Sequence, residues 1–401
     1  MIRALAALLL GGLAVAACQP PGRTSSGPDI IIASDLPLSV QPDAQSLDQA
    51  IGFAIRQQPS IDGLKLAYWA LDDSLGADFN QVRGRENVRR MIADRRVLAV
   101  VGPYTSALAK VELPEANLAG LAMLSPSTTN LCLTRTDPSC TSGNLALLRP
   151  TGAVNYFRIS PPDPVAGRYM AHYAATRLNL RRIAVFNEFD DGSMYIKEFS
   201  NELANFGGQI VFQQDFALGT KDFSEFLKQA QAHNADAVAG IASGDYDACL
   251  VAAQMSKLLP SAILLGIDGM ALNDTCITDA GPAAPTFYAA YPDVDPRTSS
   301  DPQVKQRVGA YLAAYPKPSD VDVYTFAAYD CARILIDAIH RAIRSNGGKV
   351  PSRAQVLTAL AATNGFVGVT GTYSFDKNGD AVAPLMSMYR LESGRWVSVP
   401  L

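Results

Sequence analysis

Short apolar runs alternate with amphipathic segments along the first part of the chain. The apolar runs have the length and β-branched content of buried strands, and the segments between them repeat apolar residues at helical spacing. Such alternation is typical of βαβ units with a parallel sheet. The predicted strands lie in residues 29–38, 64–73, 97–103 and 120–126, and the predicted helices lie around 46–58 and 86–96 and after Ser106.

The same alternation restarts at residue 181 and continues to about residue 269. The restart predicts a second lobe of similar build, with the passage between the lobes near residues 156–164. Ligands of open parallel sheets bind beyond the carboxyl ends of the strands, so two such lobes facing each other would form a cleft. The fold class is therefore α/β, with two Rossmann-like lobes and parallel central sheets.

Two neighbouring apolar runs end in clusters of hydroxyl side chains. The run VLAVV is followed by GPYTS, and the run AML is followed by SPSTTN. Ser106 opens a predicted helix, so its hydroxyl and the free backbone N–H groups of the helix could hold a carboxylate. Ser127 and Thr129 follow the next strand. The same residues also suit an ordinary helix cap and a turn, and the pattern alone does not separate these interpretations.

The first 17 residues have the pattern of an export signal. One Arg precedes a short apolar stretch and small residues, and Cys18 follows. The stretch before Cys18 resembles the lipobox of bacterial lipoproteins, which implies lipidation of Cys18; the alternative is a plain secretory signal with an incidental cysteine. Residues 18–28, rich in Pro, Gly and Ser, are expected to be a flexible tether. We expect an exported protein, in the periplasm or at the cell surface, anchored to a membrane by lipid.

Composition excludes several classes of function. The net charge is −4 and Lys and Arg are not clustered, so nucleic acid is not an expected partner. The chain has three His and no CxxC, so we predict no metal site and no cofactor. It also lacks the G-x-S-x-G, P-loop and G-x-G-x-x-G motifs, which argues against an enzyme.

Five cysteines follow Cys18, and an exported protein permits disulfides. Cys132 and Cys140 bracket a short polar loop and are the favoured pair over free thiols. Cys249 and Cys276 could form a second pair. Cys331 would then be a buried small apolar residue in a helix.

Several stretches in order along the chain form a recognisable set. The most specific is NGFVGVTGTYSFDKNGDAV at residues 364–382, and others are ALDDS, VVGPYTS, LSPSTTN and AAYDCARILIDAI. Together they resemble the type I periplasmic binding proteins of the leucine/isoleucine/valine-binding kind, which serve ABC importers. The resemblance implies two lobes joined by three crossovers that close on a ligand. Lobe one would comprise residues 29–158 and 293–367, and lobe two residues 159–292 and 368–401.

The resemblance also implies site residues. Ser106, Ser127 and Thr129 would hold the carboxylate and ammonium groups of an amino acid, Asp268 would receive the ammonium from lobe two, and Tyr324 would line the pocket. For Asp268 the alternative is a plain turn, and for Tyr324 a core aromatic. The implied function is the substrate-binding component of an amino-acid ABC importer, delivering a small amino acid or related polar molecule to membrane permease subunits.

The chain departs from amino-acid binders in lobe two. Ala242, Ser243 and Gly244 stand where an aromatic residue is expected, and Asp190 and Asp191 stand where a Tyr is often found. With Glu188, Asp245 and Asp247 they predict an acidic rim, which is either a solvated loop face or a sign of a polar or cationic ligand. The alternative function is an envelope lipoprotein of the same fold that acts as a sensor or activates a protein partner.

Overall fold

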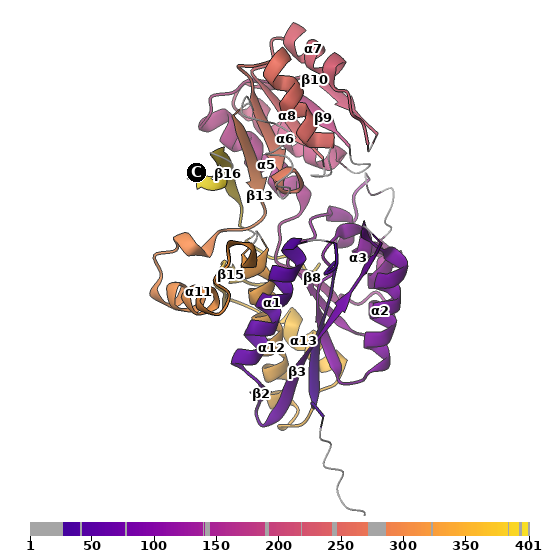
Figure 1. Ribbon diagram of the computed structural model, residues 1–401. Coiled ribbons are helices and arrows are strands. Elements are labelled where there is room, and N and C mark those ends of the chain that lie inside the picture. The colour runs from indigo at the N-terminus through magenta and orange to yellow at the C-terminus, as the bar shows by residue number, and fades with distance from the viewer. Residues whose placement is uncertain are drawn as a thin grey trace, which may run out of the picture.

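The computed structural model of the chain describes residues 27–401 except 41, 77, 139, 141–144, 189–191, 218, 243–246, 272–285, 322–323, 384, 393–394 and 400–401. Two β-sheets with helices on both faces form two lobes, one above the other in Figure 1. The prediction of two α/β lobes with parallel central sheets is confirmed.

The first sheet has six strands in the order β2-β3-β1-β6-β7-β8, and all pairs except β2–β3 are parallel. Its strand β1 is buried along its whole length. The strands are β1 (Ile30–Leu36), β2 (Ser60–Ile61), β3 (Leu64–Asp72), β6 (Val97–Val101), β7 (Ala122–Ser125) and β8 (Tyr156–Arg158).

Helices cover both faces of this sheet because successive side chains of a strand point to opposite faces. Ile30 and Ile32 pack in the core formed with α1 and α12, whereas Ile31 and Ala33 pack in the core formed with α2 and α3. The helices of this lobe are α1 (Pro42–Gln57), α2 (Gln81–Ala93), α3 (Ser106–Leu118), α4 (Leu145–Leu148), α11 (Pro302–Ala314), α12 (Thr325–Ser345) and α13 (Arg353–Ala361).

The second sheet has seven strands in the order β10-β9-β11-β12-β13-β16-β17. Its first five strands pair in parallel, and β16 and β17 add an antiparallel hairpin at the edge. The strands are β9 (Arg182–Asn187), β10 (Gln209–Asp215), β11 (Ala237–Ile241), β12 (Ile263–Ile267), β13 (Phe287–Tyr291), β16 (Ser387–Glu392) and β17 (Arg395–Val399).

The same alternation builds two cores around this sheet. Ile183 and Val185 of β9 pack with α5 and α6, and Ala184 and Phe186 pack with α7 and α8. The helices are α5 (Asp163–Thr176), α6 (Ser193–Asn205), α7 (Ser224–Ala232), α8 (Asp247–Leu258) and the single turn α9 (Asp268–Ala271).

Short elements complete the described structure. They are the two-stranded sheets β4 (Ser74–Leu75) with β5 (Asp78–Phe79) and β14 (Phe366–Val367) with β15 (Thr372–Tyr373), and the 3-10 turns η1 (Leu131–Leu133), η2 (Pro296–Thr298) and η3 (Pro318–Asp320). A disulfide joins Cys132 to Cys140, and Cys331 is a buried free thiol. Among the residues described, no helix combines the length and the apolar character needed to cross a membrane.

A buried ion pair joins two segments of the chain at the passage between the lobes. Arg158 ends β8, and its guanidinium donates to Asp380 Oδ1 at 2.8 Å, with both side chains almost fully buried. Backbone bonds run from Arg158 N to Gly379 O and from Ala381 N to Arg158 O. Arg135 adds a bond to Asp380 Oδ2 at 2.8 Å. The segment around Asp380, which leads to β16, is thereby held against the end of β8.

Candidate functional site

A cavity of about 380 Å³ lies between the two lobes, at the carboxyl ends of strands from both sheets. Both lobes contribute charged, hydroxyl and apolar side chains to its wall. From the first lobe it is lined by Tyr104, Thr105, Ser106, Ala107, Lys110, Ser127, Thr129, Asn130 and Tyr324, and from the second by Asp163, Gly192, Tyr195, Ile241, Ile267, Asp268 and Gly269.

The turn between β6 and α3 brings a helix N-terminus to this cavity. Gly102 has a φ of +129°, and a Cβ there would lie 2.9 Å from the carbonyl oxygen of Asp35, so the turn requires glycine. Thr105 caps the helix by accepting a bond from Leu108 N, and the helix begins at Ser106. The first N–H groups of a helix have no partner within it and favour negative charge. This wall of the cavity therefore suits a carboxylate.

The hydroxyl clusters that follow β6 and β7 are bonded to each other. Ser127 Oγ donates to the carbonyl oxygen of Tyr104 at 2.7 Å, and Asn130 N donates to Ser106 Oγ at 3.3 Å. Ser127 is 8% exposed and has its proton engaged by the backbone, whereas Ser106 accepts a bond and retains a proton to donate. Ser106 is thus better placed than Ser127 to bond a ligand through its side chain.

Asp268 faces this wall from the second lobe, at the point where β12 ends. The residue is half-buried, and the Tyr324 hydroxyl donates to its Oδ2 at 2.5 Å across the gap between the lobes. Burial raises the pKa of Asp268, and the bond from Tyr324 opposes that rise. Burial and the nearby Asp268 charge raise the pKa of Tyr324 well above its usual value. Tyr324 therefore stays a neutral donor that fixes the carboxylate.

The five ligand-binding residues predicted from the sequence all line this one cavity: Ser106, Ser127, Thr129, Asp268 and Tyr324. Their role in ligand binding stays a prediction. Tyr324 is 2% exposed and also packs edge-on against Tyr104, with ring centroids 6.3 Å apart. Tyr324 therefore fits both interpretations that the sequence left open, because it lines the cavity and its ring also packs against another aromatic ring.

Sequence reasoning missed Tyr195, Asp163, Lys110 and Ile241, which also line the cavity. Tyr195 lies on α6, with its pKa raised well above its usual value by burial and then by the charges of Asp268 and Asp163. It supplies an aromatic ring to the second-lobe wall, where the sequence showed no aromatic residue at the expected position. The sequence feature that could have identified Tyr195 is its position in the first turn of a helix that follows a strand.

Other sequence predictions fall elsewhere. Glu188 lines a separate cavity with Gln213 and Asp215, so it is not part of the wall described above. Cys18, Cys276, Asp190, Asp191, Ser243, Gly244 and Asp245 lie outside the described residues, as do the side chains of Asp247 and Cys249. The acidic rim and the second disulfide therefore stay predictions.

The charges of the cavity are separated by lobe. The helix N-terminus, Ser106 and Lys110 make the first-lobe wall receptive to an anion, while Asp268 and Asp163 make the opposite wall receptive to a cation. Ile241 and Ile267 add apolar surface beside the acids. None of the described lining residues is a histidine or a cysteine. The arrangement suits the binding of a small molecule that carries both charges.

The chain matches the family described as periplasmic binding protein over residues 42–395. No curated protein matches the chain. Among solved structures it is similar to a leucine binding protein from Thermotoga maritima, with 24% identity, a TM-score of 0.76, and coverage of 92% of this chain and 98% of that one.

Two further solved structures are similar in fold. An ABC transporter substrate-binding protein from Desulfitobacterium hafniense in complex with Leu has 20% identity and a TM-score of 0.74, covering 92% of this chain and 99% of that one. A solute binding protein of an ABC transporter from R. palustris in complex with 4-hydroxybenzoate has 15% identity and a TM-score of 0.72. The match covers 93% of this chain and 96% of that one. Proteins with this fold thus bind ligands with an amino group and ligands without one.

Proposed function

Because the chain belongs to the periplasmic binding protein family, we propose that it is the exported substrate-binding component of an ABC importer and binds an amino acid between its lobes. Family members bind solutes and are not enzymes. The binding residues would be Ser106, Ser127 and Thr129 on the first lobe, Asp268 on the second, and Tyr324 between them. The partners would be the ligand and the permease subunits of the importer.

The position of Asp268 carries the proposal for an amino acid. A partly desolvated ammonium needs a carboxylate to offset its lost hydration, and Asp268 faces the hydroxyls and the N-terminus of α3 across the cavity. A ligand with only a carboxylate, such as benzoate, would bring its apolar ring against that negative charge. The α-carboxylate of an amino acid would bind at Ser106, and its ammonium would bind at Asp268.

Calorimetric titration of the purified protein tests this proposal. Each amino acid of a panel is paired with the acid of the same shape that lacks the amine, for example leucine with 4-methylpentanoate and phenylalanine with 3-phenylpropanoate. We expect at least one amino acid to bind and its deaminated partner to bind much more weakly. Asp268→Asn should weaken binding by about 1.5–3 kcal/mol, the usual contribution of a hydrogen bond to a charged group, or about 10- to 150-fold.

Asp222→Asn is the matched control, because Asp222 lies on the second-lobe surface and does not line the cavity. Its Oδ1 accepts a hydrogen bond from Ser224 N at 2.9 Å. This variant should leave affinity unchanged. Equal binding of an amino acid and its deaminated partner would contradict the role given to Asp268. Failure of the whole panel to bind would favour the alternative of a sensor or an activator of a protein partner.

We also propose that lipid attached to Cys18 anchors the protein to a membrane. Cys18 lies outside the described residues, and support comes from the lipobox-like sequence before it. Expression of the full chain should give a membrane-bound form, and Cys18→Ser should release it to the soluble fraction. Mass spectrometry of the mature N-terminus distinguishes a lipidated cysteine from a plain cleavage product.

A further inference from the structure

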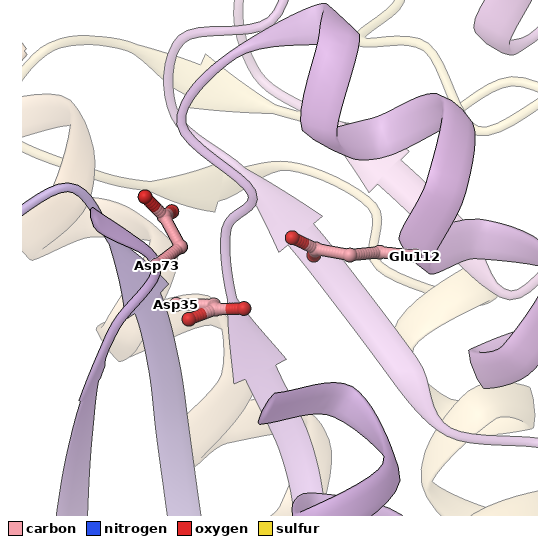
Figure 2. A group of neighbouring side chains, drawn as sticks. All are labelled: Asp35, Asp73 and Glu112. Atoms are coloured by element: carbon pink, nitrogen blue, oxygen red, sulfur yellow. The ribbon is translucent and has the colours of Figure 1, made fainter. Parts of the chain in front are cut away.

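Three carboxyl side chains that do not line the cavity between the lobes gather inside the first lobe (Figure 2). Asp35 lies near the end of β1, Asp73 directly follows β3, and Glu112 extends toward them from α3. One oxygen of each lies within 4.8 Å of the others, and all three residues have an exposed fraction of 0%. We call this group the acidic triad.

Most of the oxygens of the acidic triad have no hydrogen-bond partner among the described residues. Asn87 Nδ2 donates to Asp35 Oδ1 at 2.8 Å, and the other five side-chain oxygens accept no bond while all three acids are ionised. None of the described Lys, Arg or His side chains forms an ion pair with the three acids. Burying one carboxylate without a partner is costly, and placing three together adds their mutual repulsion.

We propose that the acidic triad binds one divalent cation of the size of calcium. Carboxylate oxygens are the ligands that Ca²⁺ takes, six to eight of them at about 2.3–2.6 Å. Oxygens on opposite sides of such an ion lie about 4.6–5.2 Å apart, whereas those around Mg²⁺ lie at most about 4.2 Å apart. The three oxygens lie within 4.8 Å of one another, a distance that a Ca²⁺ ion can span. The site is also fully buried, which favours Ca²⁺ because Mg²⁺ gives up its water ligands reluctantly.

The packing around Glu112 leaves space for its carboxylate and for little else. Gly84 of α2 lies beside it, and a Cβ at that position would stand 2.7 Å from Glu112 Oε1. Glycine at residue 84 thus leaves room for an unpartnered carboxylate between two packed helices. A side chain that needed only to fill the core would be served better here by an apolar residue, because such a residue carries no desolvation cost.

Protons are the competing way to neutralise the triad. Burial, and then the neighbouring carboxylates, raises the pKa values of Asp35 and Glu112 well above the usual range, and burial raises that of Asp73 to about 7. A proton shared between Asp35 and Glu112 would leave both oxygens of Asp73 without a partner. A single divalent cation would neutralise two of the three charges and could contact one oxygen of each carboxylate, that of Asp73 included.

A cation bound here would join the ends of β1 and β3 to α3, the helix whose first residue, Ser106, lines the cavity. The site is separate from that cavity, so its occupancy does not depend on the proposed amino-acid binding. It also departs from the absence of a metal site predicted from the sequence, where the three acids lie 38 and 39 residues apart with no metal-binding spacing.

The test uses the purified full chain after removal of metals with EDTA and dialysis. We expect calorimetry with Ca²⁺ to give about one site per chain, with a dissociation constant of about 1 mM or tighter, as for extracellular calcium modules, and weaker binding of Mg²⁺. Ten millimolar Ca²⁺ is at least about ten times this dissociation constant. It should therefore raise the midpoint of thermal unfolding by about two degrees or more. Glu112→Gln should weaken Ca²⁺ binding at least about tenfold and remove this rise.

Glu115→Gln is the matched control, because Glu115 lies on the same helix and pairs at the surface with Arg89 at 2.6 Å. It should retain the calcium response. If Glu112→Gln does not fold, Asp73→Asn takes its place in the same comparison. A wild-type protein that unfolds cooperatively without any calcium response, or a response that survives in both triad variants, would overturn the proposal and assign the charge balance to protons.

Discussion

Replacement of Asp380 by Asn should strongly destabilise the junction between the lobes. The change keeps the size of the side chain but removes the negative charge beside Arg158, whose side chain is fully buried. Breaking a buried ion pair from one side costs about 3–5 kcal/mol, because the remaining charge has lost its partner. Arg158 still donates to the carbonyl oxygen of Asn130 at 2.7 Å and to Thr134 Oγ1 at 2.9 Å, so we expect about 3 kcal/mol.

Urea unfolding at pH 7 measures this loss. With a slope of about 2.5 kcal/mol/M, the unfolding midpoint should fall by about 1.2 M. Asp337→Asn is the control, because Asp337 pairs with Arg341 at the surface at 2.8 Å, and such pairs contribute about 0.3–0.5 kcal/mol. Equal midpoint shifts for the two variants would refute the inference that the buried ion pair stabilises the junction between the lobes.

The same pair predicts a pH dependence. Burial alone would raise the pKa of Asp380, but the charges and hydrogen bonds of Arg158 and Arg135 lower it below its usual value. The stabilisation is therefore fully present above about pH 3.9, the pKa of an unfolded aspartate, and is lost as pH falls through the lower folded-state pKa. The difference between wild type and Asp380→Asn should stay constant from pH 7 to about pH 5 and shrink below about pH 4.

Three further changes test other parts of the structure. Tyr324→Phe removes the hydrogen bond to Asp268, so it should cost no more than about 1.5 kcal/mol of stability yet weaken amino-acid binding several-fold in calorimetry; unaltered affinity would contradict the orienting role. Replacing Cys132 and Cys140 together by Ser opens a loop of eight residues and should cost about 2.5 kcal/mol in urea unfolding, whereas no change would show that the loop needs no crosslink. Ile339→Ala, at a fully buried position of α12, should cost about 2–5 kcal/mol, and a cost below about 0.5 kcal/mol would contradict the core described here.

The fold could be predicted from the sequence because its signal is local and repeated. Strand β9 shows why: Ile183 and Val185 face one core and Ala184 and Phe186 the other, so a strand buried on both faces is apolar throughout. Each lobe repeats this pattern several times. The residue limits of the two lobes stay predictions, because they depend on where the chain crosses between sheets and no local pattern marks a crossing.

The site was only partly predictable. Ser106, Ser127 and Thr129 follow strands directly, so their place at one edge of a sheet follows from chain order. Tyr195 and Lys110 lie within helices, where facing the cavity or the solvent depends on how each helix is packed. The acidic triad was missed for a related reason, because its members meet only when β1, β3 and α3 pack together.

The bond between Tyr324 and Asp268 bears on how a ligand could close the cavity. It joins the two lobes at the carboxylate that we propose binds the ammonium. A ligand shifts the protein toward closure only through contacts that it makes better in the closed state. An ammonium bound beside the Tyr324 hydroxyl would add a charged donor to a carboxylate that already has a neutral one. The gain in closure must then come from the charge of the ammonium and from its contacts with the first lobe, which is why we expect the amine of the ligand, more than its side chain, to decide whether the lobes close.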